Sequence, residues 1–356
     1  MKSNGKDVIG WLLEDDNPSV KYWTLRNLLD YAEDDPRVVS ARERIMTIGP
    51  VPMILARLNA AGHYDDPNAA RSYGAERAAC GYLPKYQATT WQLILFAELG
   101  ADPNDPRIQR TCEYVLEHSW QPDGLFSMMG NQFFAPCFQG NMLYALTTLG
   151  CGNDPRVRDA LNVLVQYTRF DDGGFKTPET WPYRGKKDRC SSSHSCYAGC
   201  LKALKAIVAI PPEKRDMPIR DFVARGVQFF CVHRVYRASH TPELLLHKDI
   251  DAIAFPTFVF GDFLEIMTTL LELGVRDVWM QDAVDLLRGK QLPNGHWKLE
   301  RDVPRMIVRL GRRHRESKWA TYRAEYALKL WERQEFSRDG SHAVENASVG
   351  ARTASS

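Results

Sequence analysis

Three cysteines and one histidine share a short segment of the chain, at Cys190, His194, Cys196 and Cys200. A further thiol, Cys137, opens the preceding apolar segment of helical character, so we expect it at the level of His194 on a neighbouring helix. Thiolates and imidazoles are ligands that Zn²⁺ prefers in proteins. The spacing therefore predicts a zinc site formed by Cys137, Cys190 and His194.

The nature of this site stays open at the level of sequence. Cys80 precedes another predicted helix and is a candidate fourth ligand, which would make the site closed and structural rather than open and catalytic. Cys196 follows His194 by two residues and points about 200° away around a helix. Free cysteines are also among the most often buried residue types, so plain core packing is the alternative.

Three other side chains are candidates for acid–base catalysis. Asp262 is a carboxylate on an otherwise apolar predicted helix, where burial would raise its pKa and suit it to proton transfer. Its alternative role is to cap that helix or to face its dipole. Glu325 has a similar position on the last predicted helix, and the two acids are the pair that a carbohydrate-active enzyme would need. His240 lies in an irregular loop; such loops often carry function, and a solvated histidine is the alternative.

A strongly basic stretch precedes the last predicted helix. Forked guanidinium donors suit phosphate groups, so a diphosphate-bearing substrate, RNA and a solvated loop are all open interpretations. The basic residues of this stretch are Arg301, Arg305, Arg309, Arg312, Arg313, His314 and Arg315.

All these residues must be positioned by helices that meet at a repeated junction. Leu-Gly, a short gap and Asp-Pro-Arg recur at 99–107 and 149–156, with looser copies at 273–277 and 35–37. Glycine ends a helix because it tolerates the left-handed conformation past the last turn. Aspartate then caps the next helix and proline fits its first turn. Each copy therefore predicts a helix–turn–helix junction.

A second repeated element combines Asp or Asn with Gly and an aromatic anchor, which predicts a tight turn packed between layers of helices. Its copies lie at 121–126, 171–175 and 291–297, with a weaker one at 59–64. The copy expected near 237–248 is missing, and we expect an irregular loop there.

Nearly all-apolar segments alternate with striped amphipathic ones, which indicates two concentric layers of helices. Inner helices are predicted to begin near Pro18, Tyr86, Cys137, His194, Phe260 and Lys318, and outer helices near Pro36, Pro106, Pro155, Ile219 and Asp277. We therefore predict an all-α fold, an α/α toroid of about six inner and five or six outer helices around a central cavity. Residues 1–336 form one domain, and the Ser/Ala/Gly-rich tail 337–356 is expected to be disordered.

The repeated turns and the two layers resemble the repeats of squalene and oxidosqualene cyclases and of protein prenyltransferase β-subunits, over roughly residues 18 to 335. The chain is also similar to stand-alone prokaryotic proteins of this repeat type. The resemblance implies a terpenoid cyclase or prenyltransferase-like enzyme that takes an isoprenoid or other apolar small molecule into an aromatic-lined cavity. Cys137 and His194 match the zinc cysteine and histidine of the prenyltransferases, whereas Ala135 stands in place of the family's aspartate.

The chain also departs from the cyclases, because the Asp-x-Asp-Asp acid motif has no match in it. A non-catalytic toroid that serves as a binding or scaffold module, with structural cysteines, is therefore the alternative function.

Composition sets few further limits. A formal charge of +2 gives no reason to expect nucleic acid as a partner, and we see no apolar run long enough to span a membrane. The N-terminus lacks the features of a signal peptide, so a reducing cytoplasm is the expected location. The sequence leaves the oligomeric state open.

Overall fold

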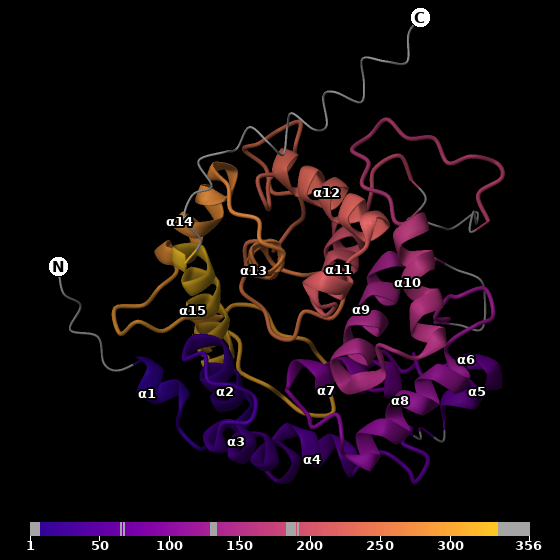
Figure 1. The fold of residues 1–356 in the computed structure, drawn as a ribbon, viewed down its shortest axis with the longest axis horizontal. Helices are drawn as coiled ribbons and strands as arrows, with labels where there is room; N and C mark the ends of the chain where they lie inside the picture. The colour runs from indigo at the N-terminus through magenta and orange to yellow at the C-terminus, as the bar shows by residue number, and fades with distance from the viewer. Residues whose placement is uncertain are drawn as a thin grey trace, which may run out of the picture.

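The computed structural model of the chain describes residues 8–64, 66, 68–128, 134–182, 190 and 192–333. This part of the chain is predominantly helical, as predicted (Figure 1). The predicted tail, residues 337–356, lies outside the described residues. None of the described helices combines the length and the apolar character needed to cross a membrane.

The Asp-Pro-Arg sequences begin helices as predicted. Asp35, Asp105 and Asp154 are N-caps, and each side chain accepts a hydrogen bond of 2.8 to 2.9 Å from the backbone N–H of the arginine two residues later. The proline between them occupies the first turn, where no N–H is needed. Gly100 and Gly150 adopt φ values of +73° and +91°, as the turn after a helix requires.

One set of helices is buried on most sides. In α7 every residue from Thr89 to Ala97 is buried, which a segment without a polar face predicts. The set consists of α2 (Pro18–Trp23), α7 (Thr89–Glu98), α9 (Pro136–Leu146), α11 (Tyr197–Val208), α13 (Phe263–Glu272) and α15 (Lys318–Arg333). These starts confirm the predicted ones within three residues.

A second set is buried along one stripe, as Val157, Ala160 and Leu164 are in α10. In Figure 1 this set lies outside the first. It consists of α3 (Pro36–Thr47), α8 (Pro106–His118), α10 (Pro155–Tyr167), α12 (Met217–Val232) and α14 (Gln281–Gly289), the last preceded by a 3₁₀ turn, η5 (Val278–Met280).

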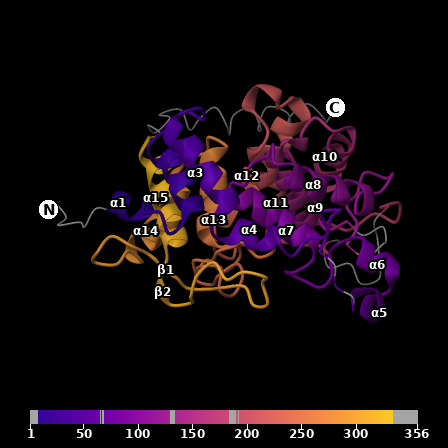
Figure 2. The same ribbon diagram turned by 90° about the horizontal axis from the view of Figure 1, so that it is seen from below.

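Several short elements complete the described part of the chain. A π-helical turn, η1 (Thr24–Leu28), continues α2, and a similar turn, η2 (Thr147–Cys151), continues α9. The short helices are α1 (Val8–Leu12), α4 (Pro50–Leu55), α5 (Ala69–Tyr73) and α6 (Ala75–Ala79), and η4 (Pro212–Lys214) is a 3₁₀ turn. Two short antiparallel strands, β1 (Lys298–Leu299) and β2 (Arg315–Glu316), lie beside loops at one end of the helices (Figure 2).

Specific contacts link several of the buried helices to one another. Between α9 and α11 the backbones nearly touch, because a Cβ on Gly140 would lie 2.3 Å from the carbonyl oxygen of Lys202. The last helix returns to the first ones, since the Asn27 amide donates to the Tyr322 hydroxyl at 2.6 Å. Trp23 then joins α2 to α7 by donating to the carbonyl oxygen of Glu98 at 2.9 Å.

In three of the repeated turns the backbone of the aromatic residue is anchored by a side chain of a buried helix. The backbone N–H of Tyr64 donates to Thr89 Oγ1 at 3.1 Å, and that of Trp297 donates to Thr321 Oγ1 at 3.0 Å. At Phe126 the Gln139 side chain bonds both the N–H and the carbonyl, each at 2.8 Å. Each aromatic residue is therefore fixed to the start of the next buried helix.

The loop after α12 is more regular than predicted. Arg237 and Leu245 form an antiparallel bridge, as Trp120 and Phe126 do in a predicted turn. The loop is two residues longer than that turn, which explains why its sequence lacks the repeat. His240 lies between the two bridge residues.

Candidate functional site

Between the buried helices lies a cavity of about 150 Å³ that opens to solvent. Much of its wall comes from the C-terminal ends of these helices: Glu98 and Glu272 are the last residues of α7 and α13, and Lys205 is in the last turn of α11. The aromatic residues of the lining are Trp23, Tyr144, Phe255, Trp319, Tyr322 and Tyr326. The cavity is thus lined by aromatic rings, as the resemblance implies, but it also contains charged groups.

Two lysines in and beside this cavity share one carboxylate, that of Glu265. Lys202 Nζ lies 2.7 and 2.8 Å from the two oxygens of Glu265, and Lys205 Nζ lies 2.8 Å from the same carboxylate. Lys205 also bonds Glu98 across to α7. Burial alone would raise the pKa of Glu265, but the two lysines hold it well below its usual range. This network fixes α7, α11 and α13 relative to one another.

Asp262, predicted as a catalytic acid, is fully buried and engaged on both oxygens. It caps α13 by accepting from the N–H of Glu265 at 2.7 Å, and it accepts from the N–H of Ala254 at 2.7 Å. The Arg323 guanidinium binds both oxygens, at 3.0 and 3.1 Å. Asp262 therefore caps the helix, which is the alternative role that the sequence allows, and it is not among the residues that line the cavity.

Glu272 differs from the other carboxylates of the cavity. Within the described residues it forms no ion pair, and its oxygen accepts a hydrogen bond of 3.2 Å from the Tyr326 hydroxyl. Burial raises its pKa to about 7, and Lys205 offsets only part of this effect. A carboxyl group that is about half protonated at neutral pH is suited to give or accept a proton.

Glu325, the other predicted acid, lies on α15 but is not part of the cavity lining. Its side chain is half-buried, and burial with the nearby Glu332 raises its pKa. Neither predicted acid, Asp262 or Glu325, therefore lines the cavity, whereas Glu272 does.

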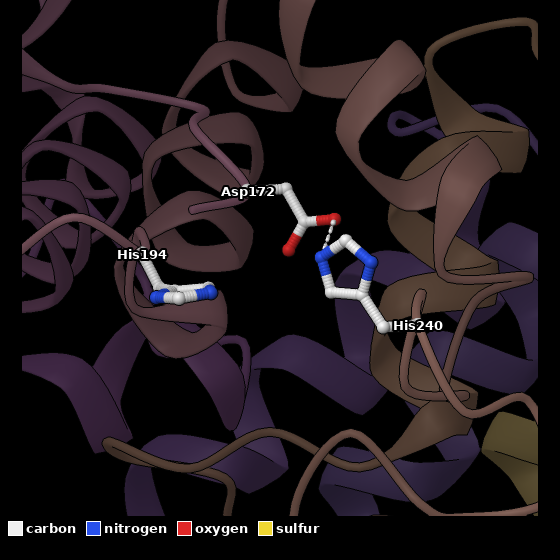
Figure 3. A group of neighbouring side chains, drawn as sticks. All are labelled: Asp172, His194 and His240. Atoms are coloured by element: carbon white, nitrogen blue, oxygen red, sulfur yellow. Dashed lines mark ion pairs between the residues drawn. The ribbon is translucent and has the colours of Figure 1, made fainter. Parts of the chain in front are cut away.

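A second group of polar side chains lies at the N-terminal end of α11. Asp172, His194 and His240 each offer a ligand atom, and these atoms all lie within 4.8 Å of one another. Figure 3 shows the three side chains directed into one space, Asp172 and His194 from the connection between α10 and α11 and His240 from the connection between α12 and α13. The distance from His240 Nε2 to Asp172 Oδ2 is 3.7 Å, and the His240 side chain is 75% exposed. A carboxylate and two imidazoles are a donor set that can hold a metal ion.

Local pairing places Asp172 beside His194. The two residues face each other in an antiparallel bridge, flanked by hydrogen bonds from Gly173 N–H to Ser193 O and from Ser195 N–H to Asp171 O. Side chains of such a pair extend from the same face and come close together.

Glycine makes room for the imidazole in this pair. Gly173 has a φ of +105°, and a Cβ on it would lie 3.0 Å from His194 Nε2. The Arg169 guanidinium holds the adjoining turn by binding the Asp171 carboxylate at 2.7 Å and the carbonyl of Ser192.

The structure does not bring the predicted zinc ligands together. Among the described residues, Cys137, Cys190 and His194 do not form a group whose ligand atoms lie within 4.8 Å of one another, and Cys80 does not join them. His194 is exposed and faces Asp172, whereas burial raises the pKa of the Cys137 thiol to about 12, with nearby Cys196 adding to the effect.

The thiols near His194 face the interior instead. Cys190, Cys196 and Cys200 line a small void together with Tyr167 and Trp181. Burial raises the pKa of Cys200 well above its usual value. The geometry therefore fits the alternative that these cysteines pack in the core.

Two residues of these sites were not predicted from the sequence. Asp172 was assigned to a structural turn, and its bridge to His194 could have been expected only from the pairing of two segments more than twenty residues apart. Glu272 lies at the end of its helix, whereas inner-helix starts were the expected positions of cavity side chains. A carboxylate at the end of an apolar helix was its one local signal.

No protein-family model matches the chain, and no curated protein is similar to it at a significant level.

Proposed function

We propose that the chain is an enzyme of α/α-toroid fold in which Glu272 transfers a proton to or from a small organic molecule in the central cavity. The packing of the helices supports the toroid. The buried helices contact one another in series, α15 returns to α1, α2 and η1, and the striped helices lie outside them (Figure 1). This is also the architecture implied by the resemblance to terpenoid cyclases and prenyltransferase β-subunits.

One observation carries the proposed chemistry: Glu272 is the cavity carboxyl that no cation neutralises within the described residues. Lys202, Lys205 and Arg323 are already bound by other carboxylates. A neutral acid that can ionise beside a small cavity is the arrangement that general acid–base catalysis requires.

The lining indicates what kind of molecule would react. Faces of Trp and Tyr rings attract positive charge, so they would stabilise a cationic transition state or intermediate. A cavity of about 150 Å³ matches the size that holds a benzene-sized molecule and is smaller than typical sites for larger ligands. We therefore expect a substrate of roughly five or six carbon atoms, such as a single isoprenoid unit, rather than a long polyprenyl chain.

An activity comparison tests this proposal. Purified protein is incubated with a mixed metabolite extract, and consumed and newly formed compounds are identified by mass spectrometry. Glu272→Gln keeps the size and the hydrogen bond from Tyr326 but cannot exchange a proton. Glu117→Gln, an exposed change on α8, is the matched control.

We expect the wild type and Glu117→Gln to convert the same compound, and Glu272→Gln to convert it at least about 100-fold more slowly. Equal rates in all three proteins would overturn the role of Glu272. If no compound is converted, the non-catalytic binding module is the better account.

A further inference from the structure

The loops that join α10 to α11 and α12 to α13 bring three potential ligands together far from the central cavity. We propose that Asp172, His194 and His240 form a binding site for a divalent transition-metal ion. This site is independent of the proposed function, because α11 separates it from the cavity residue Lys205 by most of the length of the helix.

Asp172 and His194 are placed for a ligand before any ion binds. Their bridge fixes both backbones, and Gly173 leaves the space that the imidazole occupies. The Ser193 hydroxyl lies 3.2 Å from His194 Nδ1, so this nitrogen is engaged and Nε2 remains as the ligand atom. A partner for the second ring nitrogen is what orients histidines in metal sites.

The distances fit a shared ion better than direct hydrogen bonds. Asp172 Oδ2 and His240 Nε2 are 3.7 Å apart, which is too long for a hydrogen bond. Two ligands of a tetrahedral metal at ordinary bond lengths lie roughly 3.3 Å apart. The exposed His240 side chain needs to move by only a few tenths of an ångström to bring these two atoms to that separation, and the ligand atom of His194 lies within 4.8 Å of both.

A nearby buried histidine supports the same conclusion. His233 Nδ1 lies 3.0 Å from the carbonyl oxygen of Arg237, and since a carbonyl can only accept, Nδ1 must carry the proton. In the neutral ring, Nε2 then presents a lone pair toward Asp172 Oδ1 at 3.9 Å. Two electron-pair donors repel each other, so a cation bound by the Asp172 carboxylate would stabilise this arrangement. We assign His233 the role of a positioning residue for the carboxylate.

The donor set selects the class of ion. Two imidazole nitrogens and one carboxylate oxygen suit Zn²⁺, Fe²⁺, Co²⁺ or Ni²⁺, whereas Ca²⁺ and Mg²⁺ prefer sites built from oxygen. Three protein ligands also leave a coordination position for water, which is the pattern of open rather than structural zinc sites.

Titration of the metal-free full chain with Zn²⁺ and with Co²⁺ tests the site. The variants are His240→Ala, on an exposed loop, and Asp172→Asn. His118→Ala is the matched control, because His118 is an exposed histidine outside the cluster. Cys137→Ser tests the alternative that the cysteines bind the ion. Circular dichroism checks that each variant is folded.

We expect one equivalent of Zn²⁺ to bind to the wild type, His118→Ala and Cys137→Ser with similar affinity. His240→Ala and Asp172→Asn should each bind at least tenfold more weakly. The Co²⁺ complex should show visible d–d absorption without the near-ultraviolet charge-transfer band that thiolate ligands produce.

Two results would overturn the proposal. One is that the sites do not matter for binding: His240→Ala binds Zn²⁺ as tightly as the wild type does, or the wild type binds no more Zn²⁺ than the protein that carries both Asp172→Asn and His240→Ala. The other is loss of binding in Cys137→Ser together with a thiolate band, which would move the site to the cysteines. If a proton rather than a metal ion lies between His233 and Asp172, we expect Zn²⁺ to bind the wild type no better than the doubly substituted protein.

Discussion

The raised pKa of Glu272 makes the stability of the protein depend on pH in a defined window. A carboxyl whose pKa is 4.5 in the unfolded chain and about 7 in the folded protein binds its proton more tightly when folded. Its contribution is therefore fully favourable below pH 4.5 and is lost as the pH rises through about 7. At 1.36 kcal/mol per pH unit the loss reaches about 3 kcal/mol. Glu272 is only partly buried, so solvent screens part of the effect and we expect about 2 kcal/mol.

Glu272→Gln removes this titration while keeping the shape of the side chain. We expect the variant and the wild type to unfold at equal urea concentrations at pH 4, and the variant to be more stable by about 2 kcal/mol at pH 8. Other titrating groups contribute equally to both proteins, so they cancel in the difference between the two free energies of unfolding. The assay is equilibrium urea unfolding at half-unit steps of pH, with Glu117→Gln as the control. Two stability curves that run parallel from pH 4 to pH 8 would show that Glu272 does not titrate with a raised pKa in the folded protein.

Three further substitutions test the packing that holds the cavity. Gly140→Ala should destabilise the protein by about 3 kcal/mol, because its Cβ would meet the backbone of α11. Gly289→Ala has open space and should cost little, so similar melting temperatures of the two variants would contradict the close contact. Lys202→Met should lower the free energy of unfolding by about 3 kcal/mol, because it leaves part of the buried Glu265 charge without a partner. An effect no larger than that of Lys21→Met, at a partly exposed ion pair, would count against the network. Gly62→Ala should lower the free energy of unfolding in urea by about 2 kcal/mol, because φ is +80° and the Cβ would lie 2.7 Å from a backbone nitrogen. Gly174→Ala has open space and should not; equal losses in the two variants would show that the turn at Gly62 does not require glycine.

Local sequence signals predicted the helices well because their boundaries depend on neighbouring residues. The caps at Asp105 and Asp154 and the terminating glycines at 100 and 150 act over a few residues, so a single sequence reveals them. The repeated turns were predictable for the same reason. The longer turn that carries His240 was not, because two additional residues hide the pattern while the backbone still pairs.

The sites were predicted only in part, because they depend on contacts distant in sequence. His194 and His240 were each selected as functional candidates, but for different sites, and nothing local indicated that Asp172 would join them. The cysteines near His194 suggested zinc by composition, yet the chain turns them toward the interior while the imidazole faces outward. The charged network of Glu98, Lys205 and Glu265 joins three helices and has no spacing of its own.

Proton transfer by Glu272 predicts that its protonated carboxyl ionises when positive charge enters the cavity, and calorimetry can count the proton released. Tetramethylammonium is titrated into the protein at pH 6 in two buffers that differ in ionisation enthalpy. We predict that the wild type releases about 0.9 proton per bound cation, since a group of pKa about 7 is about nine-tenths protonated at this pH. Glu272→Gln should release none and bind more weakly. Equal proton release from both proteins, or no binding of the cation to the wild type, would rule out this role for Glu272.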